Sequence, residues 1–92
     1  MATLHMDVET VRSTQSKMTQ EQQQMTTELQ NVTNSVNSTV GSAWIGNSAT
    51  EFQQQYDGLR SNITQQLERL AELAQQLQQE INQWEEMAAR MG

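Results

Sequence analysis

Apolar residues that recur every seven positions constrain the fold of this 92-residue chain more than any other feature. Such a heptad spacing places apolar side chains along one stripe of an α-helix. In the first half of the sequence the series comprises Leu4, Val11, Met18, Met25 and Val32. In the second half three adjacent series begin at Phe52, Tyr56 and Leu67 and run to Met87, Met91 and Ala88. The sequence therefore predicts an all-α fold with two long amphipathic helices, over about residues 8–40 and 48–90.

The segment between the two groups of series breaks the helical pattern. Proline is absent, and two of the four glycines flank Trp44. Asp7 is placed to cap the start of the first helix. A connection as short as residues 41–47 joins neighbouring helices that run antiparallel. We therefore predict one helix-turn-helix hairpin domain, residues 1–92, with its turn at Trp44.

Folding the chain at Trp44 sets together residues whose numbers sum to 88. In this register apolar side chains of the two helices face one another layer by layer. The predicted hairpin core consists of Val11, Met18, Met25, Leu29, Val32, Val36, Phe52, Tyr56, Leu59, Ile63, Leu70 and Leu77. Gln22 then falls opposite Gln66, where two amides can satisfy each other and penalise sliding by a heptad. The alternative is two exposed glutamines at a gap between the helices.

The second helix carries more apolar surface than one neighbour can cover. Three apolar positions per heptad form a wider face than a two-stranded contact requires. A chain this short is marginally stable alone, and the absence of cysteine removes disulfides as a source of stability. We therefore expect a dimer, with Leu67, Ala74 and Ile81 as the contacts between subunits.

Composition and charge disfavour several functional classes. The net charge is −6, and the five basic residues are scattered, so the chain lacks the basic stripe that nucleic acids and anionic membranes need. No apolar stretch approaches the length of a membrane span, so we expect no membrane insertion. His5 is the only histidine, and no nucleophile stands at a supporting spacing. We predict no enzyme activity, no metal site and no cofactor.

Trp44-Ile45-Gly46 stands near the middle of the chain, between two helical segments, and is followed by Ala49 and Phe52. With the absence of cysteine, this arrangement resembles the WXG (ESAT-like) family of small bacterial proteins over essentially the whole chain. The resemblance implies a hairpin that pairs into an antiparallel four-helix bundle, as a homodimer or with a sister protein. It also implies export as a folded dimer by a type VII secretion system with a membrane ATPase. Because a large aromatic residue at a turn is a good anchor for a partner, we expect the export machinery to recognise the turn at Trp44 and Gly46; the alternative is that Trp44 caps the end of the hairpin core.

Family members usually carry an export signal of the form Tyr-x-x-x-Asp/Glu, and this chain departs from it. Four residues after Tyr56, the only tyrosine, stands Arg60. A looser hydrophobic-x-x-x-acid pattern occurs at Ile81 and Glu85. Because the N-terminal residues lack the basic and apolar segments of a signal peptide, we expect folding in the cytoplasm and secretion without a cleavable signal. The alternative is a cytoplasmic structural adaptor, or a chaperone-like partner of a larger WXG-type protein, that is not itself exported.

Overall fold

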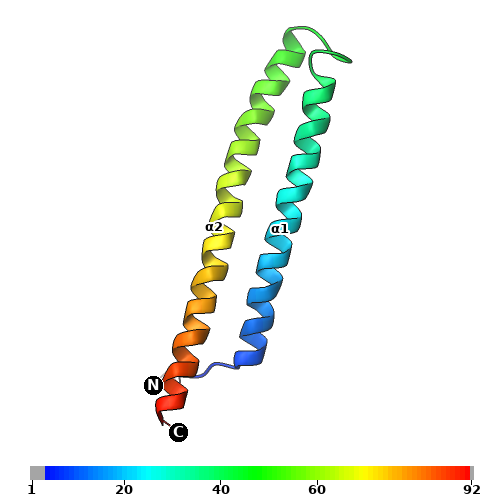
Figure 1. Cartoon of the computed structure of the whole chain (residues 1–92). Helices are drawn as coiled ribbons and strands as arrows, with labels where there is room; N and C mark the ends of the chain where they lie inside the picture. The colour runs from blue at the N-terminus through cyan, green and yellow to red at the C-terminus, as the bar shows by residue number, and fades with distance from the viewer. Residues whose placement is uncertain (1–3, 92) are drawn as a thin grey trace.

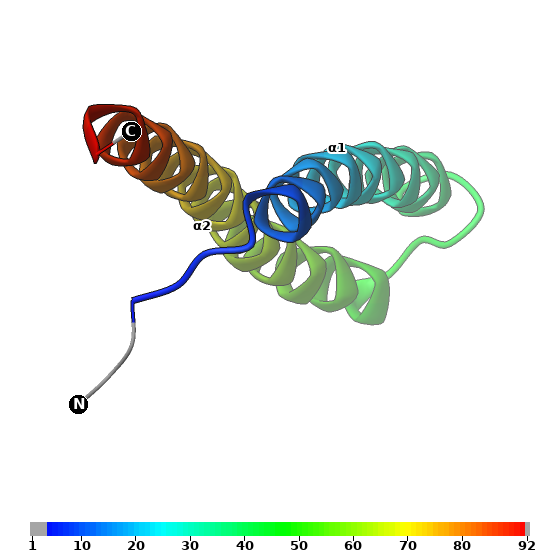
Figure 2. The same ribbon diagram turned by 90° about the horizontal axis from the view of Figure 1, so that it is seen from below.

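In the computed structural model, which describes residues 4–91, the chain forms a hairpin of two antiparallel helices (Figure 1). The first helix, α1, spans Val8–Thr39, and the second, α2, spans Asn47–Met91. The predicted all-α hairpin is confirmed. Residues 1–3 and 92 of the predicted domain lie outside the described residues. Seen along the hairpin, the two helices are inclined to each other and not strictly parallel (Figure 2).

The start of α1 is capped as the sequence predicts. Asp7 has extended backbone angles, and its carboxylate accepts a hydrogen bond of 3.2 Å from the backbone N–H of Thr10. Such a bond satisfies one of the free donors at a helix N-terminus. The same bond lowers the pKa of Asp7 below its ordinary value, because it stabilises the charged carboxylate.

The surface where α1 and α2 meet, here termed the seam, shifts between heptad series along α2. A helix has 3.6 residues per turn, so a series of period seven rotates by about 20° per heptad around a straight helix. The 45 residues of α2 measure about 67 Å at 1.5 Å each, close to the 69 Å length of the hairpin, so α2 is nearly straight. The buried side of α2 therefore passes from Ala49, near the turn, to Leu67, Ala74 and Ile81 further along.

This shift overturns the predicted dimer contacts. Leu67, Ala74 and Ile81 are buried against α1 within a single chain, and Ile81 has an exposed fraction of 0 %. They are therefore part of the hairpin core and leave almost no surface for a second subunit.

The predicted hairpin core divides into two groups. Eight of its twelve members are half-buried at or beside the seam: Val11, Met18, Leu29, Val36, Tyr56, Ile63, Leu70 and Leu77. The other four, Met25, Val32, Phe52 and Leu59, are exposed, and their placement in the core is wrong for the single hairpin. These four side chains stand to one side of the seam and not in it.

The predicted register holds near the turn and fails at the open end. The hydroxyls of Thr33 and Tyr56 lie 2.7 Å apart, and these residue numbers sum to 89. At the open end Arg12 Nη2 lies 2.8 Å from Glu85 Oε1, and these numbers sum to 97. The predicted sum of 88 assumed that one heptad series of α2 faces α1 along the whole hairpin. Toward the open end, residues of α1 instead contact residues of α2 that lie later in the sequence than predicted.

The predicted pairing of Gln22 with Gln66 is wrong. Gln66 is exposed, and the Gln22 amide donates to Thr26 Oγ1 of its own helix at 3.4 Å. Among the hydrogen bonds of the described residues, none joins the two glutamines. Gly58 lies inside α2 and is not a point of close helix approach, because a Cβ added there meets no atom within 4 Å.

Candidate functional site

The hairpin has one broad side that is rich in apolar side chains. Its exposed members are Met25, Val32, Phe52, Leu59, Leu73 and Met87, which together with the hollows between them form what we term the apolar face. On α2, four of these residues belong to the series that begins at Phe52. This series never enters the seam, because it stands to one side of the buried series along the whole helix.

Three shallow hollows follow the apolar face between α1 and α2. The one nearest the turn, of about 340 Å³, lies among Met25, Val32, Leu59 and Ile63. The next, of about 370 Å³, lies between Met25 and Leu70, and the third lies between Met18 and Leu77. Their linings are mostly aliphatic, so the face can receive the side chains of another apolar surface.

A polar side chain lies at the edge of each of the three hollows of the apolar face. Glu28 lines the hollow nearest the turn, Gln66 lines the middle one, and Glu80 lines the third. Gln66 and Glu80 occupy the same heptad series as Leu59 and Leu73. They therefore interrupt an otherwise apolar row.

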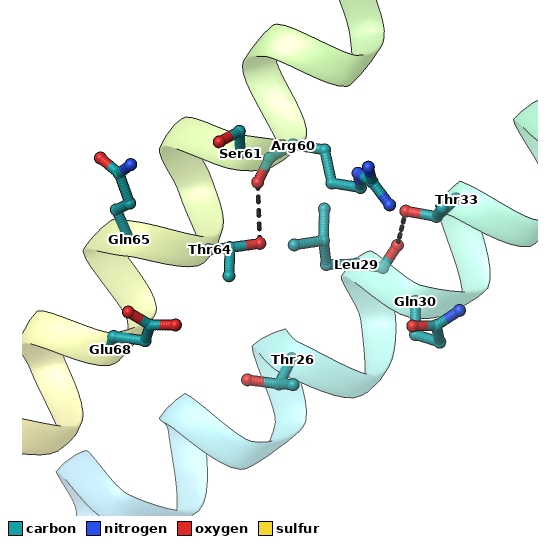
Figure 3. Close-up of a pocket in the computed structure, with 9 residues that line it drawn as sticks. All are labelled: Thr26, Leu29, Gln30, Thr33, Arg60, Ser61, Thr64, Gln65 and Glu68. Atoms are coloured by element: carbon teal, nitrogen blue, oxygen red, sulfur yellow. Dashed lines mark hydrogen bonds between the residues drawn. The ribbon is translucent and has the colours of Figure 1, made fainter.

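The opposite side of the hairpin is polar. Its hollow, of about 600 Å³, is lined by hydroxyl, amide and charged side chains from both helices, with Leu29 at its floor (Figure 3). Thr64 Oγ1 donates to the carbonyl of Arg60 at 2.8 Å, and Thr33 Oγ1 donates to the carbonyl of Leu29 at 2.8 Å. These hydroxyl hydrogens are engaged within their own helices, and no buried side-chain polar atom of the described residues lacks a partner. The larger hollow therefore gives no sign of a ligand site.

The turn is held in one conformation by backbone hydrogen bonds and two glycines. The N–H of Trp44 donates to the carbonyl of Thr39 at 3.0 Å, and the N–H of Gly41 donates to the carbonyl of Trp44 at 2.9 Å. Gly41 and Gly46 have φ angles of +89° and +136°, which side-chain-bearing residues rarely adopt. The glycines on either side of Trp44 thus permit a tight connection between two long helices.

Trp44 packs against Phe52, in the second turn of α2. Its ring lies 5.4 Å from the ring of Phe52, tilted by 51°, an arrangement favourable for aromatic pairs. Both rings line a small hollow with Val36, and Trp44 remains 39 % exposed. The neighbouring Ile45 is 78 % exposed, so the outermost apolar side chain of the turn is one that the sequence did not single out.

The candidate export pattern at Ile81 and Glu85 is not free. Ile81 is wholly buried in the seam, and the Glu85 carboxylate forms an ion pair with Arg12 of α1. A partner that recognised both side chains together would have to separate the helices at the open end. The structure therefore removes the simplest version of this signal.

Two further classes of site are absent from the part of the chain that the structure describes. Within residues 4–91 no cluster of His, Cys, Asp and Glu is arranged to hold a metal ion. In the same part of the chain, neither helix has an apolar stretch long enough to span a membrane.

Comparison with known proteins agrees with the hairpin and its central turn. A family model described as proteins of 100 residues with WXG matches residues 3–91. The chain belongs to the WXG100 family. Members of this family are small helical proteins without enzyme activity that generally pair with themselves or with sister proteins, and the family is associated with secretion. No match to this WXG100 protein was found among the curated proteins or among the solved structures.

Proposed function

We propose that this WXG100 protein is one half of an antiparallel four-helix bundle, exported as a folded dimer by a type VII secretion system. The observation that carries the proposal is the apolar face, which a single hairpin leaves uncovered. Leu59, for example, is 55 % exposed, and Leu73 and Met87 are also exposed. Contiguous apolar surface of this kind on a small domain is typical of a protein–protein interface.

Burial of the apolar face would supply stability that the hairpin lacks. Full burial of a large aliphatic or aromatic side chain contributes about 1.5–3 kcal/mol. Six such side chains are about half-exposed in the single chain, so covering them contributes several kcal/mol before the cost of association. A 92-residue chain without disulfides gains most from such a partner.

The turn is the part of the molecule that we propose the export machinery, including its membrane ATPase, recognises. Trp44 is partly exposed on a backbone that the flanking glycines and two hydrogen bonds hold in place. A rigid, exposed aromatic residue is a good anchor for a partner, because little conformational entropy is lost on binding.

Ile81 and Glu85 support a second candidate function. Because one is buried and the other is paired with Arg12, the hairpin alone presents no free hydrophobic-x-x-x-acid pattern there. A chain whose own signal is blocked fits a cytoplasmic structural adaptor or a chaperone-like partner of a larger WXG-type protein. Between these two functions we favour export, because it also accounts for the exposed turn.

Export is tested by blotting culture supernatants and cell lysates of strains with and without the type VII membrane ATPase. We expect the protein in the supernatant only when the ATPase is present. Trp44→Ala should reduce export while circular dichroism shows an intact fold, and Gln65→Ala on the polar side should leave export unchanged. A protein confined to the lysate of both strains would contradict export and support the adaptor. Normal export of folded Trp44→Ala would contradict recognition of the turn.

Pairing is tested separately by size-exclusion chromatography with light scattering. We expect a mass of two chains at micromolar concentration, for the protein alone or with a sister WXG100 protein. A well-folded monomer under all these conditions would contradict the bundle.

A further inference from the structure

We propose that Ile45 is a specificity-determining residue of the turn, and that its side chain enters an apolar, uncharged pocket of the export machinery. This inference rests on the proposed recognition of the turn. It adds a contact residue and the chemistry of the partner surface. The exposure of Ile45, the fixed backbone on either side of it and the absence of charge around it support this role.

Ile45 is the most exposed large apolar side chain of the turn. Its exposed fraction is 78 %, whereas that of the neighbouring Trp44, which packs against Phe52, is 39 %. A partner that covers the turn therefore buries most of the Ile45 side chain for the first time, while much of the Trp44 ring is already buried within the hairpin. Removal of apolar surface from water is the main source of affinity in such a contact.

The backbone on both sides of Ile45 is fixed within the turn. The N–H of Trp44 donates to the carbonyl of Thr39, and its carbonyl accepts from the N–H of Gly41. Gly46 has a φ of +136°, and its carbonyl accepts a backbone hydrogen bond of 3.1 Å from α2. Among the backbone hydrogen bonds of the described residues outside the helices, none involves Ile45, so its two neighbours hold it in place. A side chain presented on a fixed backbone loses little conformational entropy on binding.

The end of the hairpin that carries Ile45 has no charged side chain. Residues 29–50 contain no Asp, Glu, Lys, Arg or His, although the whole chain has eleven acidic and five basic residues. The turn therefore offers a partner no group for an ion pair. A charged group of the partner buried against it would lose water without gaining a counter-charge. The surface complementary to the turn is accordingly apolar and uncharged.

The position of the turn lets a partner approach it end-on. The turn lies at the end of the hairpin opposite the start of α1 and the end of α2 (Figure 1), and the hairpin is 69 Å long. A partner can thus cover Ile45 without reaching the open end, where Ile81 is buried and Glu85 is paired. The hollow of about 250 Å³ that Trp44 lines with Val36 lies at the same end as Ile45 and can receive an apolar side chain of the partner.

A binding titration with the full-length type VII membrane ATPase in detergent tests this inference. A dye on Gln65→Cys, on the polar side of the hairpin, reports binding by fluorescence anisotropy and leaves the turn unmodified. Ile45→Ala should weaken binding by about tenfold or more, because it removes most of the side chain from the pocket. Ile45→Val, which removes a single methyl group, should weaken it by about threefold. Leu4→Ala is the matched control and should leave binding unchanged, because Leu4 is 81 % exposed but precedes α1, away from the turn.

Two further measurements on Ile45→Ala show whether the effect belongs to the pocket. The factor by which it weakens binding should be the same at low and high ionic strength, because burial of an aliphatic side chain does not depend on charge. Its urea unfolding midpoint and its mass by light scattering should match those of the unmodified protein, because Ile45 is mostly exposed in the hairpin.

Three results would overturn this inference and leave the proposed function standing. Binding that Trp44→Ala weakens and Ile45→Ala does not would place recognition on the Trp44 ring. Loss of the dimer in Ile45→Ala would show that Ile45 contacts the second subunit and not the export machinery. Equal weakening by Leu4→Ala and Ile45→Ala would show that no pocket distinguishes the turn. An unmodified protein that does not bind the ATPase would overturn recognition of the turn and this inference together.

Discussion

Two rows of apolar side chains run side by side along α2, and they differ in burial. One row, represented by Leu67, Ala74 and Ile81, is buried against α1 in the single chain. The other, represented by Leu59 and Leu73, is exposed on the apolar face. Both rows carry aliphatic side chains at heptad spacing, although Gln66 and Glu80 interrupt the exposed row. What separates them is their angle around α2 relative to the direction of α1.

The buried and exposed rows of α2 also differ in the size of their side chains. Two of the buried positions of α2 are alanines, Ala49 and Ala74, whereas the exposed row carries larger side chains such as Phe52 and Leu73. Small side chains in a seam let two helices approach closely. Large side chains beside it are suited to fill the hollows of a second hairpin. The following predictions test this division, from the largest expected effect to the smallest.

Ile81→Ala should have the largest effect on the hairpin itself. Removing a fully buried aliphatic side chain costs about 2–5 kcal/mol, and Ile81 is completely inaccessible. Urea unfolding at several protein concentrations measures this loss, which should appear at every concentration. Leu59→Ala is the matched change in the exposed row, and its cost should grow with concentration as the dimer forms. Equal costs for the two variants in dilute solution would contradict the division.

Ala74→Leu should destabilise the hairpin by about 1–3 kcal/mol, because extra atoms in a close seam force the helices apart. Ala89→Leu, at an exposed position of the same helix, should change stability by less than about 0.5 kcal/mol. Thermal or urea unfolding of both variants provides the comparison. If Ala74→Leu were as harmless as Ala89→Leu, the seam would not depend on a small residue there.

Thr33→Val tests the polar contact that the buried Thr33 makes with Tyr56 across the seam. Because Thr33 Oγ1 already donates to the Leu29 carbonyl, the Tyr56 hydroxyl is the donor in the bond between them. Loss of this bond should cost about 1 kcal/mol. Tyr56→Phe should cost a similar amount, and the double variant less than the sum of the two. Additive costs in urea unfolding would show that the two hydroxyls do not interact.

Glu85→Gln should have the smallest effect. Its ion pair with Arg12 is the only one between the helices among the described residues, and both side chains are about half-exposed. Such a pair contributes about 0–1 kcal/mol, and salt screens it. The loss should therefore be measurable at low ionic strength and vanish near 1 M salt. Glu86→Gln, which removes a pair with Arg90 within α2, is the control. A loss that persists in high salt would point to a role for Glu85 other than charge.

Much of the architecture could be predicted from the sequence, because it depends on local patterns. Heptad spacing predicted two helices, and Asp7 was correctly placed as the cap of α1. The glycines around Trp44 marked the turn, and Trp44-Ile45-Gly46 pointed to the family that the comparison then showed. The excess of apolar positions on α2 also correctly indicated more apolar surface than α1 covers.

The tertiary structure alone decided which apolar row faces inward. A helix has 3.6 residues per turn, so residues spaced seven apart shift by about 20° per heptad around a straight helix. Over the 45 residues of α2 that small difference moves the seam from the Tyr56 series to the series of Leu67, Ala74 and Ile81. Phe52 and Leu59, near the turn, lie beside the seam and are exposed on the apolar face. The sequence thus determined that the hairpin has a seam and an uncovered face, and the rotation of straight helices determined which residues belong to each.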